Sequence, residues 1–348
     1  MRIVKQRIDQ IKQIYAVAVT GTEEGLRLLA ASEGLAECKV YAYPDFEARV
    51  VSGNPGGTTD LCPHPDTDSQ FFAVTNFVPI FQAEKAKLVY VWKDTDDLWQ
   101  MQDIAIIPFL HRFDVIRLDG KLVLVGATLC SSKQSQDDWS DPGEVFAAEI
   151  DESSFTLKNR RNILKDLVRN HGFTKTSFQG TDSYLISGDF GTYVLPIPPS
   201  FENEWVARRL FDEFPVSDIA AGDIDGDGED EIALITPFHG SDFRILKPVN
   251  GEYREVYHRD IAFGHVLWFG EVNGIPSFVL GYREGDGQLL LIRSDGNGGF
   301  SETTLDTACG PSQIACFQED DCFRILSANR KTGPIIGDVV LYTLYEGK

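Results

Sequence analysis

Short apolar runs separated by turn-forming residues alternate along almost the whole chain. Their lengths, and their content of β-branched and aromatic residues, are typical of β-strands. Clear examples are the runs at 121–126 (KLVLVG), 183–188 (SYLISG), 231–236 (EIALIT), 277–281 (SFVLG) and 322–328 (CFRILSA). The clearest helical pattern, at residues 24–33, is short and competes with a strand over 26–31. The hydrophobic pattern therefore predicts an all-β protein.

The apolar runs recur as a larger unit, seven times along the chain. Each unit has a leading residue, a strand, a tight turn, an apolar strand, a long polar loop and two further strands. The leading residues are spaced by 44, 52, 60, 46, 48 and 47 positions, at Tyr15, Thr59, His111, His171, Ser217, His265 and Ser312. Four strands in a repeat of this length are typical of a β-propeller. We therefore predict one domain, residues 1–348, folded as a seven-bladed β-propeller of four-stranded blades.

The chain length is consistent with a repeat architecture. A single hydrophobic core rarely serves 348 residues. A propeller avoids that limit because many small cores lie side by side. The alternative is a pair of two-sheet β-sandwiches, which would not require the regular spacing of the leading residues.

Composition and charge narrow the expected partners. The net charge of −21, with no basic cluster, argues against nucleic acid and anionic membrane surfaces. No apolar run approaches the length of a membrane span, and no apolar signal segment follows residues 1–13, so we expect a cytoplasmic protein. The six cysteines form no CxxC pair and are expected to be reduced thiols. An anionic substrate would need a local group of Arg, Lys or His.

An Asp-rich loop in the fifth unit has the spacing of a Ca²⁺ site. Carboxylates stand at positions 1, 3, 5 and 9, and the backbone carbonyl of Glu229 is available at position 7. The predicted metal ligands are Asp223, Asp225, Asp227, Glu229 and Glu231. Position 12, where an EF-hand has a bidentate Glu, is the apolar Leu234, so the loop is not an EF-hand.

The segment around this loop, SDIAAGDIDGDGEDEIALIT at 217–236, resembles the FG-GAP or VCBS type of propeller repeat. In that family the loop joins the first two strands of a blade. The full motif covers only the fifth unit, while the other units keep the rhythm without the carboxylates. The resemblance implies a structural Ca²⁺ that pins a hairpin away from the ligand-binding face.

Four of the six histidines are expected to converge on one face. In a propeller the innermost strand of each blade begins on the same face as the loop between the second and third strands. His111, His171 and His265 are leading residues, and His239 lies in such a loop of the fifth unit. Neutral imidazoles can bind a divalent ion or share acid and base work near neutral pH. We therefore predict His111, His171 and His265 as acid/base groups or as ligands of a second divalent metal (Zn²⁺, Mn²⁺ or Mg²⁺), with His239 as a further catalytic candidate.

Cationic and aromatic residues fall in the corresponding loops of other units. Arg283 and Lys331 would suit a carboxylate or an oxyanion, and Trp139 and Tyr282 would suit stacking on a sugar ring. The sequence thus adds Tyr282 and Arg283 to the catalytic candidates. The predicted substrate-binding residues are Asp138, Trp139, Arg330 and Lys331.

This combination resembles propeller enzymes that act on carbohydrates by β-elimination, namely aldos-2-ulose dehydratase and the propeller polysaccharide lyases. The resemblance is in fold and residue type, without a shared diagnostic motif, and no residues remain for the cupin domains of the dehydratase. It implies a lyase or dehydratase that acts on an oxidised or acidic sugar, with a small-molecule or oligosaccharide substrate that is anionic or a keto-sugar.

Two other functions remain open at this point. A non-catalytic FG-GAP propeller could bind a glycan or a protein through the same face. A propeller glycoside hydrolase would need two carboxylates at a defined separation. The carboxylates available for that role are Asp138, Asp141, Asp189 and Glu284.

Overall fold

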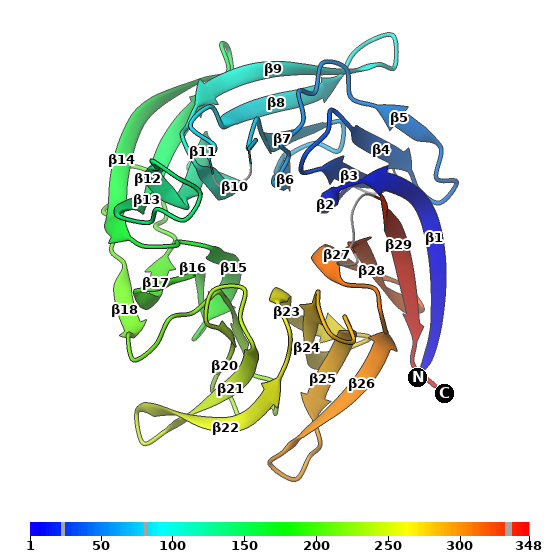
Figure 1. Cartoon of the computed structure of the whole chain (residues 1–348), viewed down its shortest axis with the longest axis vertical. Coiled ribbons are helices and arrows are strands. Elements are labelled where there is room, and N and C mark those ends of the chain that lie inside the picture. The colour runs from blue at the N-terminus through cyan, green and yellow to red at the C-terminus, as the bar shows by residue number, and fades with distance from the viewer. Residues whose placement is uncertain (22–24, 80–81, 331–335, 348) are drawn as a thin grey trace.

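The computed structural model describes residues 1–21, 25–79, 82–330 and 336–347. Its strands form seven separate sheets, arranged as blades around a central axis (Figure 1). Every paired strand in these sheets is antiparallel to its neighbour, and the described residues contain no helix. The prediction of an all-β, seven-bladed β-propeller with four-stranded blades is confirmed.

The strands of the first four blades follow one another along the chain. Blade 1 contains β2 (Ile14–Thr20), β3 (Arg27–Ser32), β4 (Cys38–Ala42) and β5 (Ala48–Val50). Blade 2 contains β6 (Asp60–Pro63), β7 (Gln70–Thr75), β8 (Lys87–Lys93) and β9 (Trp99–Ile106). Blade 3 contains β10 (Leu110–Leu118), β11 (Lys121–Thr128), β13 (Asp141–Asp151) and β14 (Thr156–Leu167), with the short β12 (Cys130–Ser132) paired to β13. Blade 4 contains β15 (Gly172–Phe178), β16 (Thr181–Gly188), β17 (Gly191–Pro196) and β18 (Arg208–Phe211).

The last three blades complete the ring. Blade 5 contains β19 (Asp218–Gly222), β20 (Glu231–Thr236), β21 (Asp242–Val249) and β22 (Glu252–Asp260). Blade 6 contains β23 (Gly264–Val272), β24 (Ile275–Tyr282), β25 (Leu289–Ser294) and β26 (Phe300–Asp306). Blade 7 contains β27 (Pro311–Glu319), β28 (Cys322–Asn329), β29 (Ile336–Tyr345) and β1 (Arg2–Lys12).

The ring is closed by the N-terminal strand. β1 pairs with β29 from Arg2 opposite Tyr345 to Lys12 opposite Ile336, and so forms the outermost strand of blade 7. Figure 1 shows β1 and β29 side by side, with the two chain ends together. The seventh blade is therefore built from both ends of the described chain.

Hydrophobic side chains pack between neighbouring blades. Within the described residues, the buried side chains form seven clusters, and each cluster joins two adjacent blades. The middle strands are therefore buried on both faces, which explains why β20 (EIALIT) is an unbroken apolar run rather than an alternating one. This arrangement lets 348 residues share many small cores.

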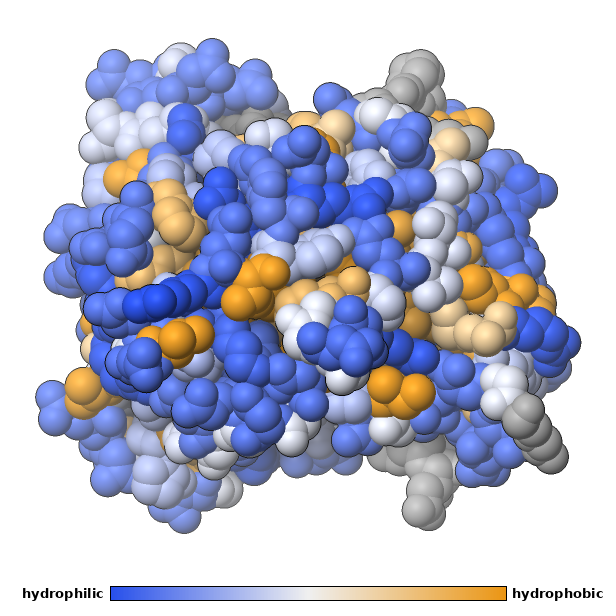
Figure 2. Space-filling view, turned by 90° about the horizontal axis from the view of Figure 1, so that it is seen from below, coloured by the Kyte–Doolittle hydropathy of each residue, from blue (hydrophilic) through white to orange (hydrophobic). Residues whose placement is uncertain are grey.

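The segment with the ambiguous helical pattern is a strand. Residues Arg27–Ser32 form β3 and pair with β2, because the side chains of Leu28 to Ala31 are all buried between blades. Residues 22–24 lie outside the described residues. Among the described residues, no helix is long and apolar enough to cross a membrane. Figure 2, which views the disc from its edge, shows a mainly hydrophilic surface on that part of the rim, with small separated hydrophobic patches.

Candidate functional site

The seven leading residues lie at the start of the innermost strands. Each of them is within one residue of the first position of β2, β6, β10, β15, β19, β23 or β27. All seven side chains are at most 4% exposed. Seven polar or aromatic side chains are thus buried around one end of the central channel.

A β-bulge sets the direction of four of these side chains. The strand register leaves out His111 in β10 and His265 in β23. The same irregularity occurs at Tyr15 in β2 and Ser312 in β27. A bulge re-aims the residue that it leaves unpaired. The two histidines therefore depend on local backbone irregularity for their direction.

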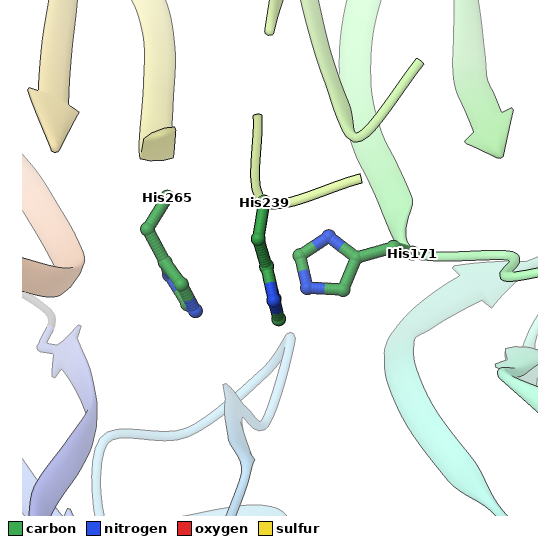
Figure 3. Close-up of side chains that lie close together, drawn as sticks. All are labelled: His171, His239 and His265. Atoms are coloured by element: carbon green, nitrogen blue, oxygen red, sulfur yellow. The ribbon is translucent and has the colours of Figure 1, made fainter. Parts of the chain in front are cut away.

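Three histidines from blades 4, 5 and 6 lie close together, with His239 between His171 and His265 (Figure 3). The ring centroid of His239 is 5.0 Å from that of His171 and 5.3 Å from that of His265. His111 of blade 3 joins them, with its ring centroid 4.9 Å from that of His171. His239 lies in the loop between β20 and β21, where its backbone has a φ of 48° and its amide donates to Ser217 Oγ at 3.0 Å. The structure thus brings together all four predicted histidines.

A hydrogen bond determines which nitrogen of His171 carries the proton and which has the free lone pair. Its Nδ1 lies 3.0 Å from the backbone carbonyl of Ser217, which can only accept, so Nδ1 carries the proton. Nε2 of His171 is then the lone-pair nitrogen, and it is buried without a hydrogen-bond partner. Nδ1 of His111 and Nδ1 of His265 are also buried without a partner. Each of the three rings therefore has one nitrogen without a protein partner.

Burial holds these imidazoles in the neutral form. It lowers the pKa of His111, His171 and His265 well below the usual value, and neighbouring histidine and arginine side chains lower these pKa values further. Burial, followed by the charge of Arg283, lowers the pKa of His239 to about 3. Neutral imidazole is the form that binds a metal ion.

The group best placed to hold a metal ion differs from the predicted trio. One ligand nitrogen each from His171, His239 and His265 lies within 4.8 Å of the others, whereas His111 is not part of this group. Nitrogens around a tetrahedral Zn²⁺ with bonds of about 2.0–2.1 Å stand about 3.4 Å apart, so the rings would have to draw together around an ion. The donor set fits a borderline ion such as Zn²⁺ better than Mg²⁺, which prefers oxygen ligands.

A cavity of about 210 Å³ lies beside the histidines. It is lined by Tyr15, Glu33, Phe77, His111, His239, Phe263, His265, Arg283 and Arg330. Arg330 forms an ion pair with the buried carboxylate of Glu33, and the guanidinium of Arg283 lies 4.8 Å from the ring centroid of Phe263. The cavity therefore combines neutral imidazoles with two guanidinium groups.

One predicted catalytic residue, Tyr282, and two predicted substrate-binding residues, Asp138 and Trp139, do not line the histidine cavity. Tyr282 is 4% exposed in the core between blades 5 and 6, where its hydroxyl donates to Gln288 Oε1 at 2.6 Å, so stacking on a sugar does not follow from its position. The ring of Trp139 packs against Phe238, which itself contacts His171. Asp138 accepts hydrogen bonds from Gln134 and Ser140 in its own loop. Lys331 lies outside the described residues.

Three of the carboxylates considered for a glycoside hydrolase have local partners, namely Asp138, Asp141 and Asp189. Asp189 is paired with Arg169 at 2.9 Å, and Asp141 accepts a hydrogen bond from Ser132 at 2.6 Å. Glu284 is exposed, and its amide donates to the carbonyl of Ala262 at 2.9 Å. These contacts do not support an acid/base pair among the four residues, because none of them lines the histidine cavity.

The Asp-rich loop joins β19 and β20 of blade 5 and has an oxygen donor set that fits Ca²⁺. Oxygen atoms of Asp223, Asp225 and Glu231 lie within 4.8 Å of one another. Glu231 is fully buried, and burial raises its pKa. The ammonium of Lys247 in β21 contacts Asp225 Oδ2 and lies 2.8 Å from Asp227 Oδ2 and 3.2 Å from Glu231 Oε1. A positive charge from the chain itself thus already lies against three of the predicted ligands.

Sequence reasoning missed a second cavity of about 330 Å³ in the channel. Its polar lining includes Asp60, Arg112 and Asp218 from the innermost strands of three blades. Burial raises the pKa of Asp218 to about 7, although the nearby Arg112 opposes this shift. Each of the three directly follows a leading residue, and this regular placement was the signal that could have identified them.

Comparisons with known proteins support the fold. No family model matches the chain, and no curated protein matches its sequence. A protein of Bacteroides uniformis, provisionally described as a 6-phosphogluconolactonase, has a similar structure, with a TM-score of 0.53 and 12% identity over 95% of each chain. A Bacteroides fragilis protein with the same provisional description has a TM-score of 0.50 and 11% identity over 94% of this chain and 93% of its own. At these identities the similarity shows a shared fold.

Proposed function

We propose that this protein is a metal-dependent carbohydrate enzyme that performs β-elimination on an acidic or oxidised sugar. The observation that carries the proposal is the group formed by His171, His239 and His265, whose ligand nitrogens lie within 4.8 Å of one another. Buried neutral imidazoles beside arginine side chains suit a site that binds a cation and an anionic substrate together. The sugar-related description of the two fold neighbours is consistent with a carbohydrate substrate.

The histidines would hold the ion and keep water away from it. A divalent ion bound there would polarise a carboxylate or carbonyl oxygen of the substrate and so acidify the neighbouring C–H bond. His171 is oriented for ligation because the carbonyl of Ser217 holds its Nδ1–H, leaving Nε2 for the ion. His239 is held at its backbone by the same residue, through Ser217 Oγ.

Arg283 and Arg330 would orient the anionic end of the substrate. Both line the cavity, and Arg330 is already neutralised by Glu33. Arg283 lies at the same cavity, and burial lowers its pKa. A carboxylate bound beside this guanidinium would favour its charged form.

Proton transfer can be assigned to two further cavity residues. His111, which lines the cavity, would accept the proton from the carbon next to the carboxylate. The electron pair of that C–H bond then forms the double bond while the C–O bond at the β-carbon breaks. Tyr15 would protonate the leaving oxygen, because burial raises the pKa of its phenol and keeps it protonated. A negatively charged substrate would also raise the low pKa of His111 toward the range useful for a base.

Metal content and product chemistry test the proposal together. We would measure bound metals by mass spectrometry in the wild type, in His171→Ala and His239→Ala, and in Arg254→Ala as a control at an exposed side chain of blade 5. Each protein would then be incubated with uronic-acid oligosaccharides, and the ultraviolet absorbance of the new double bond would be followed.

We expect about one equivalent of a transition metal or zinc in the wild type and the control, its loss in the two cavity variants, and double-bond formation only where the metal is bound. Unsaturated products from a metal-free wild type would contradict the metal-dependent mechanism. If the protein instead opened a sugar lactone without forming a double bond, its activity would be hydrolysis and not elimination. Unchanged sugars that bind equally to all variants would favour a non-catalytic binding protein.

A further inference from the structure

The Asp-rich loop of blade 5 is neutralised by a cation from a neighbouring strand. Lys247 lies on β21, and its ammonium contacts Asp225, Asp227 and Glu231. We infer that Lys247 is the resident counter-ion of this loop, and that a divalent cation must displace it in order to bind. Lys247 therefore determines the Ca²⁺ affinity of the loop. This inference is independent of the function proposed for the histidine cavity.

A cation is needed at this position because one carboxylate is fully buried. Glu231 has no exposed surface, and only its Oε2 accepts a backbone hydrogen bond, from Ile224 at 3.1 Å. Oε1 has no hydrogen-bond partner of acceptable geometry and lies 3.2 Å from Nζ of Lys247. An uncompensated buried carboxylate strongly destabilises a fold. The ammonium of Lys247 supplies the charge that Glu231 requires.

The remaining loop carboxylates are organised by the backbone. Asp223 Oδ1 accepts from Gly226 at 2.7 Å, and its Oδ2 accepts from Gly228 at 2.9 Å. Asp227 Oδ1 accepts from Glu229 at 3.0 Å, which leaves its Oδ2 for Lys247 at 2.8 Å. The loop is thus folded around a positive charge, and the hairpin keeps its shape with lysine in place.

Lysine and Ca²⁺ would need the same oxygen atoms. Ca²⁺ binds oxygen ligands at about 2.3–2.6 Å, so an ion bound to Asp225, Asp227 and Glu231 would overlap the position of Nζ. The two positive charges would also repel each other at this separation. The Lys247 side chain is 25% exposed, so its flexible stem can carry the ammonium out to water.

This competition predicts weak Ca²⁺ binding by the natural chain. When a ligand binds only a minor conformation, its apparent dissociation constant equals the intrinsic constant divided by the fraction of molecules in that conformation. If the lysine-out conformation makes up a tenth of the molecules or less, the wild type binds at least about tenfold more weakly than a chain without the ammonium.

Calorimetric titration with Ca²⁺ tests the inference. Lys247→Met keeps the apolar length of the side chain and removes the charge. Lys158→Met is the control, because Lys158 forms an ion pair with Asp151 in a hairpin of blade 3, away from the loop. We expect Ca²⁺ to bind Lys247→Met at least tenfold more tightly than the wild type, and the control to match the wild type.

Either of two results would overturn the inference: equal affinity in Lys247→Met and the wild type, or no Ca²⁺ binding by either protein. Because loss of the ammonium leaves Glu231 uncompensated, Lys247→Met is expected to melt at a lower temperature without Ca²⁺ and to gain more from added Ca²⁺ than the wild type does. If Lys247→Met does not fold without Ca²⁺, it can be purified in Ca²⁺ and titrated with a competing chelator, which again compares its Ca²⁺ affinity with that of the wild type. Lys247→Gln provides a second variant for this comparison.

Discussion

The hydroxyl of Tyr15 lies 3.4 Å from Nε2 of His265, a contact between blade 1 and blade 6. The two rings meet edge to face, with their centroids 5.4 Å apart. Both residues lead their innermost strands, and both lie at β-bulges. The two residues are separated by 250 positions in the sequence. They become neighbours because each lies at the start of an innermost strand, at the same end of the channel.

Replacement of Tyr15 by Phe should lower turnover without loss of metal. Removal of the phenolic proton donor would lower kcat by about 10²- to 10⁴-fold if Tyr15 protonates the leaving group. Tyr41→Phe is the matched control, since Tyr41 is a buried tyrosine of blade 1 whose hydroxyl donates to Asp9 at 2.8 Å. Steady-state kinetics with the unsaturated-product assay measures the effect. Equal kcat values for Tyr15→Phe and the wild type would remove Tyr15 from the mechanism.

Acid should destabilise the protein through its neutral histidines. The pKa of His239 falls from about 6.5 in the unfolded chain to about 3 in the fold, so only the unfolded chain gains a proton between these values. The stabilising contribution is complete above pH 6.5 and is lost as pH falls toward 3. His239→Gln should reduce the pH dependence of the unfolding free energy in this window by up to about 1.4 kcal/mol per pH unit. Urea unfolding at several pH values provides the measurement, and an unaltered slope would contradict the assignment.

The channel carboxylate Asp218 should have the opposite effect. Its pKa is raised to about 7 in the fold, so the folded chain holds a proton that the unfolded chain has lost above about pH 4. The contribution of Asp218 to stability therefore falls as pH rises from 4 to 7. Asp218→Asn should raise Tm by about 2–4 °C at pH 8 and change it little at pH 4. A Tm difference that is the same at both pH values would show that the raised pKa is not the cause.

Packing of β1, the strand that closes the ring, should contribute to the free energy of unfolding. Ile11 of β1 is fully buried in the cluster between blades 7 and 1, so Ile11→Ala should lower the free energy of unfolding by about 2–5 kcal/mol. Val4 lies on the same strand but is 41% exposed, so Val4→Ala should cost less than about 1 kcal/mol. Denaturant unfolding of both variants measures the difference. Equal effects would mean that β1 adds little to closure.

Much of the fold could be predicted because each blade repeats the same local order of strands and turns. The spacing of the leading residues located the innermost strands and three of the four histidines of the site. His239 was located by its loop between the second and third strands of the fifth unit. The contribution of β1 to blade 7 could not be predicted in this way, because the pairing of Arg2 with Tyr345 has no local signal. It depends on the ring closing in three dimensions.

The details of the site depend on side-chain direction, which spacing alone does not specify. Tyr282, which was expected in a loop, is the last residue of β24, and its side chain lies in the core. Lys247 reaches the Asp-rich loop from a different strand, so no motif within the loop could include it. The group proposed to bind a metal contains His239 from a loop in place of the leading residue His111, and only the distances between the ligand nitrogens distinguish the two.

The pairing of Arg2 with Tyr345 brings the first and last strands to the same edge of blade 7. A short peptide could therefore join the two termini, and new termini could be opened at the exposed turn of Asn250 and Gly251 between β21 and β22. Such a circular permutant would keep every strand pair, although β22 and blade 6 would now come first along the chain. The histidine cavity thus requires the blades to keep their order around the axis, but it does not require them to keep their order along the chain.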